Sequence, residues 1–385
     1  MNRQNKINML VMYERFCGGE TRATEEIMQE LKKYPQVSIS SYALHPLIHT
    51  DFVRFFYWII TSVLRWIYII GSHRHTDWIY TTTYTAGVAA LLCKPFLHYR
   101  IAWHIHGNRV PPMHTQIRGK TYITQMIKHT VVSFFHSVLV RHADEIFAPT
   151  IEGKQLVISW HTDADEQKIH IIPNGVDQKR FHPISGSQRL LIRKKYRLNN
   201  HHHVFLSVGR VEKQKGYEQL LLVMTHLYKS DPYVRLYIVF PSVLSAAEDG
   251  YKHVLMNLIH AYHLDAIVQM IENPRHIEKY YHLSDITLSL SLLEFFPLTM
   301  LESMASGTIF MGTHIGEMKR FLPSVDSRLL FASSDADKQA RQIRRMLSLS
   351  EAEKTTIRNK AQQQMKLFTW NHSTKKIFYY LIKHT

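Results

Sequence analysis

The sequence is poor in cysteine and in acidic residues, and each shortage excludes something. Only two cysteines, Cys17 and Cys93, occur among 385 residues, so a disulfide framework is excluded and a reducing compartment is expected. Lysine and arginine outnumber aspartate and glutamate by 47 to 31, which gives a formal net charge of +16. That excess predicts attraction to an anionic partner, such as nucleic acid, an acidic membrane or a phosphate-bearing substrate.

The N-terminal stretch lacks the pattern of a signal peptide. Its apolar run is short and ends at Glu14, so it predicts a first β-strand rather than a leader. The apolar fraction of 45% is ample for buried cores, and the length allows two or three domains.

Strand-like apolar runs alternate with helix-like stretches along both halves of the chain. Such alternation predicts parallel sheets with crossover helices, so the fold class is α/β with two doubly wound, Rossmann-like domains. The strands expected in the first half are 7–13, 37–44, 78–83, 101–105, 145–149 and 169–173. Those expected in the second half are 204–208, 234–240, 267–271, 286–290, 309–312 and 329–332.

The stretch 290–307, LSLLEFFPLTMLESMASG, has the clearest chemistry. An apolar strand breaks at Glu294, Pro297 occupies a plausible first helical position, and Gly307 ends the short helix. Glu294 and Glu302 therefore lie at a strand-to-helix junction, where free backbone N–H groups favour an anion. Two acceptors for sugar hydroxyls beside an anion site suit a nucleotide-activated sugar.

This stretch resembles the E-x7-E signature of the retaining glycosyltransferases of family 4, which have the GT-B fold. Three further segments stand in the family's order: CGGETR (17–22), IIPNGVDQKRFHP (171–183) and the G-R-x4-K-G element in FLSVGRVEKQKGYEQLL (205–222). The resemblance implies two Rossmann-like domains facing each other across a cleft. The N-terminal, acceptor-binding domain is expected at 1–185, completed by a C-terminal helix that crosses back at 368–385, and the nucleotide-sugar domain at 186–367.

The resemblance also assigns roles to residues. Glu294 and His106 are the predicted catalytic residues, with Glu294 near the donor sugar and His106 beside the reacting centre. The predicted donor-binding residues are Gly19, Arg210, Lys215, Glu302, Phe296, Pro297 and Leu298. Arg210 and Lys215 neutralise the departing diphosphate, so no metal and no cofactor are expected beyond a UDP-, GDP- or ADP-linked sugar as donor substrate.

Three loops depart from the family pattern. Phe295 stands where relatives usually have glycine, and a Cβ with a ring makes a positive φ or a close backbone approach harder to reach. The sequence VFPS (239–242) replaces a usual G-x-G turn, and IENP (271–274) lacks a glycine often seen near the base. These changes leave the nucleotide open and motivate one rival function, a non-catalytic GT-B subunit that binds a membrane or partner.

The segment 52–70, FVRFFYWIITSVLRWIYII, is the most apolar of the chain and is long enough for a membrane span. Arg54, Thr61 and Arg65 share one narrow stripe, flanked by Trp58 and Trp66. A span would separate the glycine loop from the glutamate pair. Two alternatives remain open: an amphipathic helix lying in the membrane surface and a buried crossover helix of the first domain.

The surrounding region favours a membrane over nucleic acid. Between Phe52 and Arg141 ten lysines and arginines stand against one acid, Asp77, and no zinc-finger, RRM-like or helix-turn-helix pattern accompanies them. Arg54, Trp58, Arg65, Trp66 and Arg109 are the predicted membrane or acceptor residues. We therefore expect a retaining, metal-independent glycosyltransferase that is cytoplasmic, peripheral on the inner face of the membrane, and acts on a lipid-linked or polysaccharide acceptor. A GT-B sugar-nucleotide epimerase is the second rival function.

Overall fold

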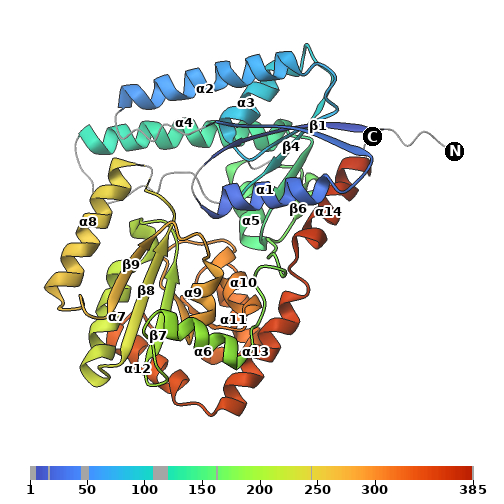
Figure 1. Cartoon of the computed structure of the whole chain (residues 1–385). Helices are drawn as coiled ribbons and strands as arrows, with labels where there is room; N and C mark the ends of the chain where they lie inside the picture. Colours follow the sequence, from blue (N-terminus) through green and yellow to red (C-terminus); the bar gives the residue numbers. More distant parts are fainter. Residues whose placement is uncertain are drawn as a thin grey trace. The chain divides into compact units, whose positions relative to one another are not determined.

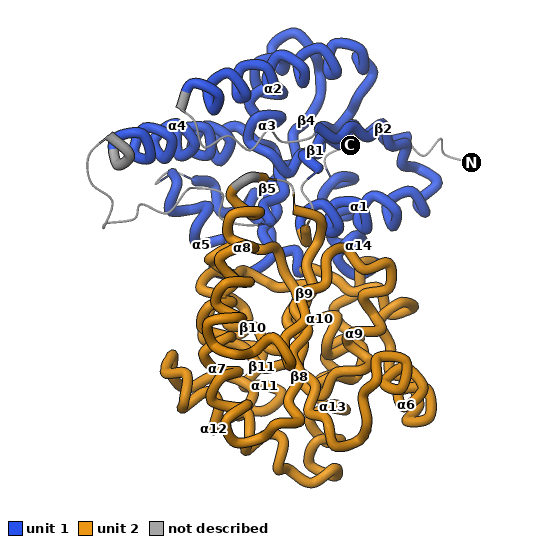
Figure 2. The backbone as a smooth tube through the Cα atoms, turned by 60° about the vertical axis from the view of Figure 1, so that its left-hand side comes forward, with its two compact units in different colours: residues 1–16, 20–173, 371–385 blue, residues 17–19, 174–370 orange. Residues whose placement is uncertain are grey.

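The computed structural model describes residues 6–15, 18–44, 52–106, 120–161, 164–243 and 245–383. The chain forms two compact units, shown in different colours in Figure 2. Unit 1 comprises residues 1–16, 20–173 and 371–385, and unit 2 comprises residues 17–19 and 174–370. The divisions thus fall after residues 173 and 370, where the sequence prediction had placed them after 185 and 367.

Unit 1 is built on a parallel sheet of six strands in the order β2-β1-β3-β4-β5-β6. Its strands are β1 (Ile7–Glu14), β2 (Val37–Leu44), β3 (Trp78–Thr81), β4 (Arg100–His104), β5 (Glu145–Ala148) and β6 (Ile169–Ile171). Its helices are α1 (Gly19–Leu31), α2 (Phe52–Ser72), α3 (Tyr84–Cys93), α4 (Lys120–His142), α5 (Ile151–Trp160) and α14 (Trp370–Lys383), with a short 3-10 turn, η1 (Glu166–Lys168).

Alternate residues of each strand pack under different helices, because successive side chains point to opposite faces of a sheet. Ile79 and Ile146 belong to the core beneath α2, α3, α4 and α5. Phe147 and His170 face the other way, and the ring of Tyr380 on α14 lies 6.2 Å from Phe147 and 3.6 Å from His170. Figure 1 shows α14, in red, beside this sheet. The predicted return of the C-terminal helix to the first unit is therefore confirmed.

Unit 2 has a parallel sheet of five strands in the order β11-β10-β7-β8-β9. Its strands are β7 (His203–Val208), β8 (Val234–Phe240), β9 (Val268–Glu272), β10 (Ile286–Ser289) and β11 (Ile309–Gly312). Its helices are α6 (Gly186–Lys195), α7 (Tyr217–Ser230), α8 (Ala246–Ala261), α9 (Glu278–Leu283), α10 (Leu298–Ala305), α11 (Met318–Val325), α12 (Ala336–Leu347) and α13 (Glu351–Met365), with 3-10 turns η2 (Lys213–Lys215) and η3 (Ser327–Leu329).

Both units are doubly wound parallel sheets, which confirms the predicted fold class. One expected strand is wrong. Within residues 329–332, Leu329 ends the 3-10 turn η3, and Leu330 makes a single bridge with Gly312 at the very end of β11, after which the chain turns away to α12.

Helix α2 combines features of the two alternatives left open for it. In the described residues one helix, Val53–Ser72, is long and apolar enough to cross a membrane, by length and composition alone. One face of α2 belongs to the core of unit 1, because its Trp58 and Ile59 side chains are buried and its Trp66 side chain is fully buried. The assignment of Trp58 and Trp66 to a membrane surface is therefore corrected, since both rings pack inside unit 1. Arg54 and Arg65 lie on exposed positions of the helix.

Candidate functional site

The candidate site of unit 2 lies where two strand-to-helix loops leave the middle of the sheet. The chain moves outward from β7 to β8 and β9, then crosses back to β10 and β11 on the other side of β7. Strand order therefore reverses between β7 and β10, which pair in parallel. In open α/β sheets a crevice forms at the carboxyl ends of such strands, and ligands bind there.

The two loops are tied together through their backbones. The Leu292 N–H donates to the carbonyl of Gln214 at 2.7 Å. Gly216 has φ of +68°, and a Cβ at that position would lie 2.0 Å from the Leu290 carbonyl oxygen. Only glycine fits this conformation and this approach. The β7–α7 loop is thus held against the β10–α10 loop, which fixes the side chains that both present.

The predicted pair Lys215 and Glu294 meets in this structure. The Lys215 ammonium forms an ion pair with Oε1 of Glu294, and the two side chains are only 19% and 17% exposed. The Ser291 hydroxyl donates to the same carboxylate oxygen at 3.3 Å. Because an ammonium has three donors, Lys215 can hold Glu294 and still bind a phosphate oxygen.

Arg210 begins the same loop, next to a different carboxylate. Its Nη1 lies 2.5 Å from Oε1 of Glu212, whose other oxygen accepts from the Gln214 amide at 2.6 Å. The Tyr217 hydroxyl donates to the Gly209 carbonyl at 3.0 Å, and burial, with Glu294 as a lesser cause, raises the pKa of Tyr217. Tyr217 therefore stays a neutral donor that holds the start of the loop.

Gly18 and Gly19 of the predicted glycine loop belong to unit 2. A Cβ on Gly18 would lie 3.4 Å from Cδ of Arg210, and one on Gly19 would lie 3.4 Å from Cδ1 of Leu298. Gly19, Arg210 and Leu298 were all predicted to bind the donor, and the fold brings them into one neighbourhood.

Helix α10 begins without a side-chain cap. Its N-cap residue, Pro297, makes no capping hydrogen bond, and proline has no N–H of its own. Phe296, Pro297 and Leu298 are buried, and the Asn174 amide donates to the Phe296 carbonyl at 2.8 Å. Any contact of these three residues with a donor would therefore use the backbone, and the helix start supplies positive potential there.

Glu302, the second predicted carboxylate, lies deeper than Glu294. It is 3% exposed, and the Tyr281 hydroxyl of α9 donates to its Oε2 at 2.8 Å. The structure thus separates the two glutamates by environment: Glu294 is part of the loop surface and pairs with Lys215, whereas Glu302 is held inside the unit.

Two of the positions where glycine was expected are filled without strain. Phe295 is absent from the described non-glycine residues with positive φ, and its carbonyl accepts the Glu317 N–H at 2.7 Å. The same loop is approached closely by Gly316, where a Cβ would lie 2.1 Å from the Glu294 carbonyl oxygen. Asn273 adopts φ of +44°, a conformation that asparagine tolerates better than most residues.

His106 lies just beyond the carboxyl end of β4 in unit 1. Its ring stacks on that of His104 with centroids 4.1 Å apart, and Nδ1 of His104 is hydrogen-bonded to the Tyr80 hydroxyl. Burial, and then His106, holds the pKa of His104 well below its usual value. His104 is therefore a neutral support for His106. Arg109 falls in 107–119 and lies outside the described residues.

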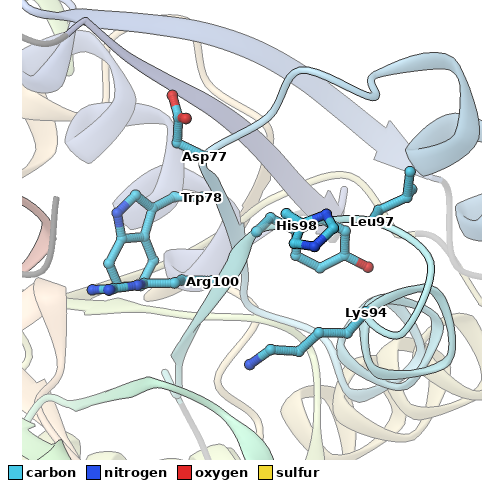
Figure 3. A pocket seen from close by; sticks show the side chains of 7 residues that line it. Asp77, Trp78, Lys94, Leu97, His98 and Arg100 are labelled. Carbon is cyan, nitrogen blue, oxygen red and sulfur yellow. The ribbon is translucent and has the colours of Figure 1, made fainter.

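A separate pocket of about 410 Å³ opens at the amino edge of the unit 1 sheet, where β3 and β4 begin (Figure 3). It is lined by Asp77, Trp78, Lys94, Leu97, His98, Tyr99 and Arg100. Lys94 is paired there with Asp144 at 2.6 Å, and the Arg100 guanidinium lies over the Trp78 ring. None of the predicted site residues lines this pocket.

The second of two Asp-Ala-Asp runs in the sequence is engaged in contacts within the protein. In the described part of the chain no three His, Cys, Asp or Glu side chains gather as metal ligands. The sequence contains two Asp-Ala-Asp runs, 163–165 and 335–337. Asp335 caps α12 by accepting the Lys338 N–H at 2.8 Å, and Asp337 is paired with Arg341.

Sequence reasoning missed three residues that hold the site: Ser291, Glu212 and Tyr281. Ser291 stands three residues before Glu294, and Glu212 stands two residues after Arg210, so proximity along the chain was a usable signal for both. Tyr281 is 21 residues from Glu302, and nothing in the local sequence marks that contact.

Two family models match the chain, one in each half. Residues 25–180 match the model described as Glycosyltransferase Family 4, and residues 188–363 match Glycosyl transferases group 1. Curated relatives include a D-inositol 3-phosphate glycosyltransferase of Nocardiopsis dassonvillei, 30% identical over 54% of this chain and 49% of its own. An alpha-galactosylglucosyldiacylglycerol synthase of Streptococcus pneumoniae is 25% identical over 36% of this chain and 35% of its own. The chain spans about half the length of the first of these relatives.

Solved structures resemble the whole chain. A sucrose-phosphate synthase from Thermosynechococcus elongatus has a TM-score of 0.80 at 17% identity, covering 99% of this chain and 100% of that one. The Anabaena protein HepE, solved with UDP-glucose, has a TM-score of 0.74 at 16% identity, covering 98% and 100%. At such identities the likeness concerns the fold.

Proposed function

We propose, from the premise that this chain belongs to the glycosyltransferases of family 4 and has the GT-B fold, that it moves a sugar from a nucleotide diphosphate sugar to a lipid-linked or cell-surface polysaccharide acceptor with retention of configuration. The observation that carries the donor assignment is the Lys215–Glu294 ion pair at the strand-order reversal of unit 2. It joins the cation assigned to the diphosphate to the carboxylate assigned to the sugar.

The proposed chemistry needs charge stabilisation more than a nucleophile. The bond between the anomeric carbon and the diphosphate oxygen breaks while the acceptor oxygen bonds to the same face of that carbon. The acceptor's proton passes to the departing diphosphate, so the products are the glycosylated acceptor and a nucleoside diphosphate. Arg210, Lys215 and the N–H groups that begin α10 are assigned to the developing phosphate charge.

The other predicted residues keep their assignments as proposals. Glu294 orients the donor sugar through its hydroxyls and Glu302 acts toward the ribose, while His106 acts on the acceptor side of the reaction. A solved neighbour named as a complex with UDP-glucose supports a uridine nucleotide as the first donor to try. GDP- and ADP-linked sugars follow.

We extend the proposal to location, namely the cytoplasmic face of a membrane, with the protein bound peripherally. Ten lysines and arginines against one acid between Phe52 and Arg141 support an anionic surface. A relative named as a synthase of a glycosylated diacylglycerol supports a lipid-linked acceptor.

Calorimetric titration with UDP, GDP and ADP tests the donor site. Lys215→Ala should weaken binding of the preferred diphosphate by about 1.5–3 kcal/mol, the range for a charged hydrogen bond. Lys213→Ala is the matched control, because Lys213 is an exposed lysine of the same loop. If a folded Arg210→Ala/Lys215→Ala protein binds all three diphosphates as the wild type does, the donor assignment fails.

A further inference from the structure

An apolar stripe runs along the outer face of α2. Its members are 58–80% exposed, and their spacing of four, three, four and four residues keeps them on one side of a helix. They are Val53, Tyr57, Ile60, Leu64 and Tyr68. Large apolar side chains scattered singly on a surface need no explanation, but a continuous row of five does.

Helix α4 lies beside α2 in unit 1 and also exposes apolar side chains. Helix α3 packs against both α2 and α4, and the Lys128 ammonium of α4 lies 5.1 Å from the centre of the Phe55 ring of α2. Figures 1 and 2 both show α2 and α4 running alongside each other. Ile123, Met126 and Phe134 of α4 are 41–61% exposed. We call the five residues of the α2 stripe the outer apolar face.

We propose that the outer apolar face docks on an anionic lipid bilayer, with α2 lying in the plane of the membrane surface. This inference deepens the peripheral location proposed above, and it rests on that proposal only for the identity of the acceptor. The proposed membrane contacts are now made by exposed side chains of α2, since Trp58 and Trp66 are buried.

The position of α2 in unit 1 excludes a transmembrane orientation of the folded protein. Trp66 and Ile70 are buried in the core that also contains Ile79 of β3 and Ile101 of β4. Pulling α2 across a bilayer would expose that core on the sheet. Lying in the interface satisfies both faces, because the inner side keeps its core contacts and the outer side enters the headgroup and acyl boundary.

The basic charge near the stripe favours an anionic bilayer over a second copy of this chain as the partner. Arg65 follows Leu64 by one residue, about 100° around the helix, so its long side chain can reach headgroup phosphates while the stripe is inserted. A second copy of this chain would bring the same basic surface against itself, which is unfavourable. An anionic bilayer instead attracts each nearby lysine or arginine by about 1 kcal/mol.

Flotation of the full-length protein with vesicles tests the proposal. Vesicles of phosphatidylcholine with phosphatidylglycerol should carry the wild type upward, phosphatidylcholine alone should carry little, and 0.5 M salt should release bound protein as screening shortens the Debye length to about 4 Å. Leu64→Glu should lower partitioning by at least about tenfold, because the variant loses the burial of one leucine side chain in the bilayer.

Unit 2 offers matched controls. Leu191→Glu, the control for Leu64→Glu, changes a leucine of similar exposure on α6. Arg65→Glu should also lower flotation, and its control, Arg345→Glu, changes an exposed arginine on α12. Both controls should float as the wild type does. Equal loss in Leu64→Glu and Leu191→Glu, or no flotation of the wild type, overturns the proposal.

Two further readouts separate the outcomes. Urea unfolding of each variant shows whether it is folded, and Tyr68→Ser repeats the test at the most exposed position of the stripe, 80%. A wild type that dimerises in sedimentation and ignores lipid, with the dimer lost in Leu64→Glu, assigns the face to a second copy. Binding of nucleoside diphosphate in solution depends on unit 2 alone, so failure of docking and failure of the donor site are distinguished.

Discussion

The two units differ in the balance of their charges. In unit 2, cations are joined to carboxylates both at the proposed donor site and at structural positions, as in Lys215 with Glu294 and Arg193 with Asp285. In unit 1, the region from Phe52 to Arg141 has ten cations and a single acid, and its outer helices expose an apolar face. Paired charges fix a geometry, whereas an excess of one sign attracts a partner from outside.

This difference suggests a division of labour. A soluble donor with a diphosphate needs a few groups held in place, which unit 2 supplies through ties between neighbouring loops. The proposed membrane-anchored acceptor would instead be met by bringing the protein to a surface, and the basic excess of unit 1 favours an anionic one. Two results would contradict this comparison: that unit 2 does not depend on its ion pairs, or that α2 has no functional outer face.

The largest expected effect is loss of a buried cation in unit 2. The Arg193 side chain is 4% exposed, donates to the carbonyls of Leu283 and Asn199 at 3.0 Å, and lies 3.4 Å from Asp285. Burial opposes ionisation of Asp285, but Arg189 and Arg193 outweigh it and lower its pKa. Arg193→Ala should destabilise unit 2 by about 3–5 kcal/mol, the effect of removing one partner of a buried pair. Urea unfolding measures it, and Arg345→Ala should stay within about 0.5 kcal/mol of wild type.

The two faces of α2 give the next prediction. Trp66→Ala should cost about 3–5 kcal/mol, because it opens a cavity in the unit 1 core. Tyr68→Ala, two residues away and 80% exposed, should change stability by no more than about 0.5 kcal/mol. Equal losses in urea unfolding would mean that the outer face is packed against something within the protein, and the contrast with unit 2 would disappear.

The sequence was sufficient for features that repeat along the chain. Alternating apolar runs placed both sheets, since each strand buried on both faces stands out from its amphipathic crossover helices. The only expected strand that failed, 329–332, is a short apolar run that reaches its neighbour at one bridge. The local sequence indicates that such a segment is buried. Whether it pairs with β11 along its whole length depends on the path of the chain after Leu330, which the local sequence does not show.

The residues of the candidate site were predictable from the sequence, but the contacts between them were not. Lys215 and Glu294 could be named from the resemblance, but their ion pair could not. The two residues are 79 apart in sequence and meet because β7 pairs with β10. The sequence left open whether α2 is a buried crossover helix, and Trp58 and Trp66 were assigned to a membrane surface, because α2 is apolar on both faces and periodicity does not show which face is the core.

A smaller effect concerns acidic pH and unit 1. The pKa of His104 lies well below 6.5, chiefly through burial and then through His106, while the unfolded chain titrates near its ordinary value of about 6.5. Below that pH the unfolded state binds a proton that the folded state refuses, so stability falls as pH decreases, by up to about 1.4 kcal/mol per pH unit. His104→Gln should flatten the decrease between pH 7.5 and 5.5, whereas exposed His98→Gln should leave it. An unchanged slope in His104→Gln contradicts the assignment.

The smallest expected effect is that of a chelator on donor binding. Arg210 and Lys215 already stand at the proposed diphosphate position, each beside a carboxylate, Glu212 and Glu294 respectively. A diphosphate can share Lys215 with Glu294 through the remaining ammonium donors, so side chains and the start of α10 can offset its charge without an ion. EDTA should therefore leave the affinity for UDP, or whichever diphosphate binds best, unchanged in calorimetry. Binding that vanishes with EDTA and returns with Mn²⁺ or Mg²⁺ would mean that unit 2 depends on an external cation, and that its own paired charges do not suffice for the donor.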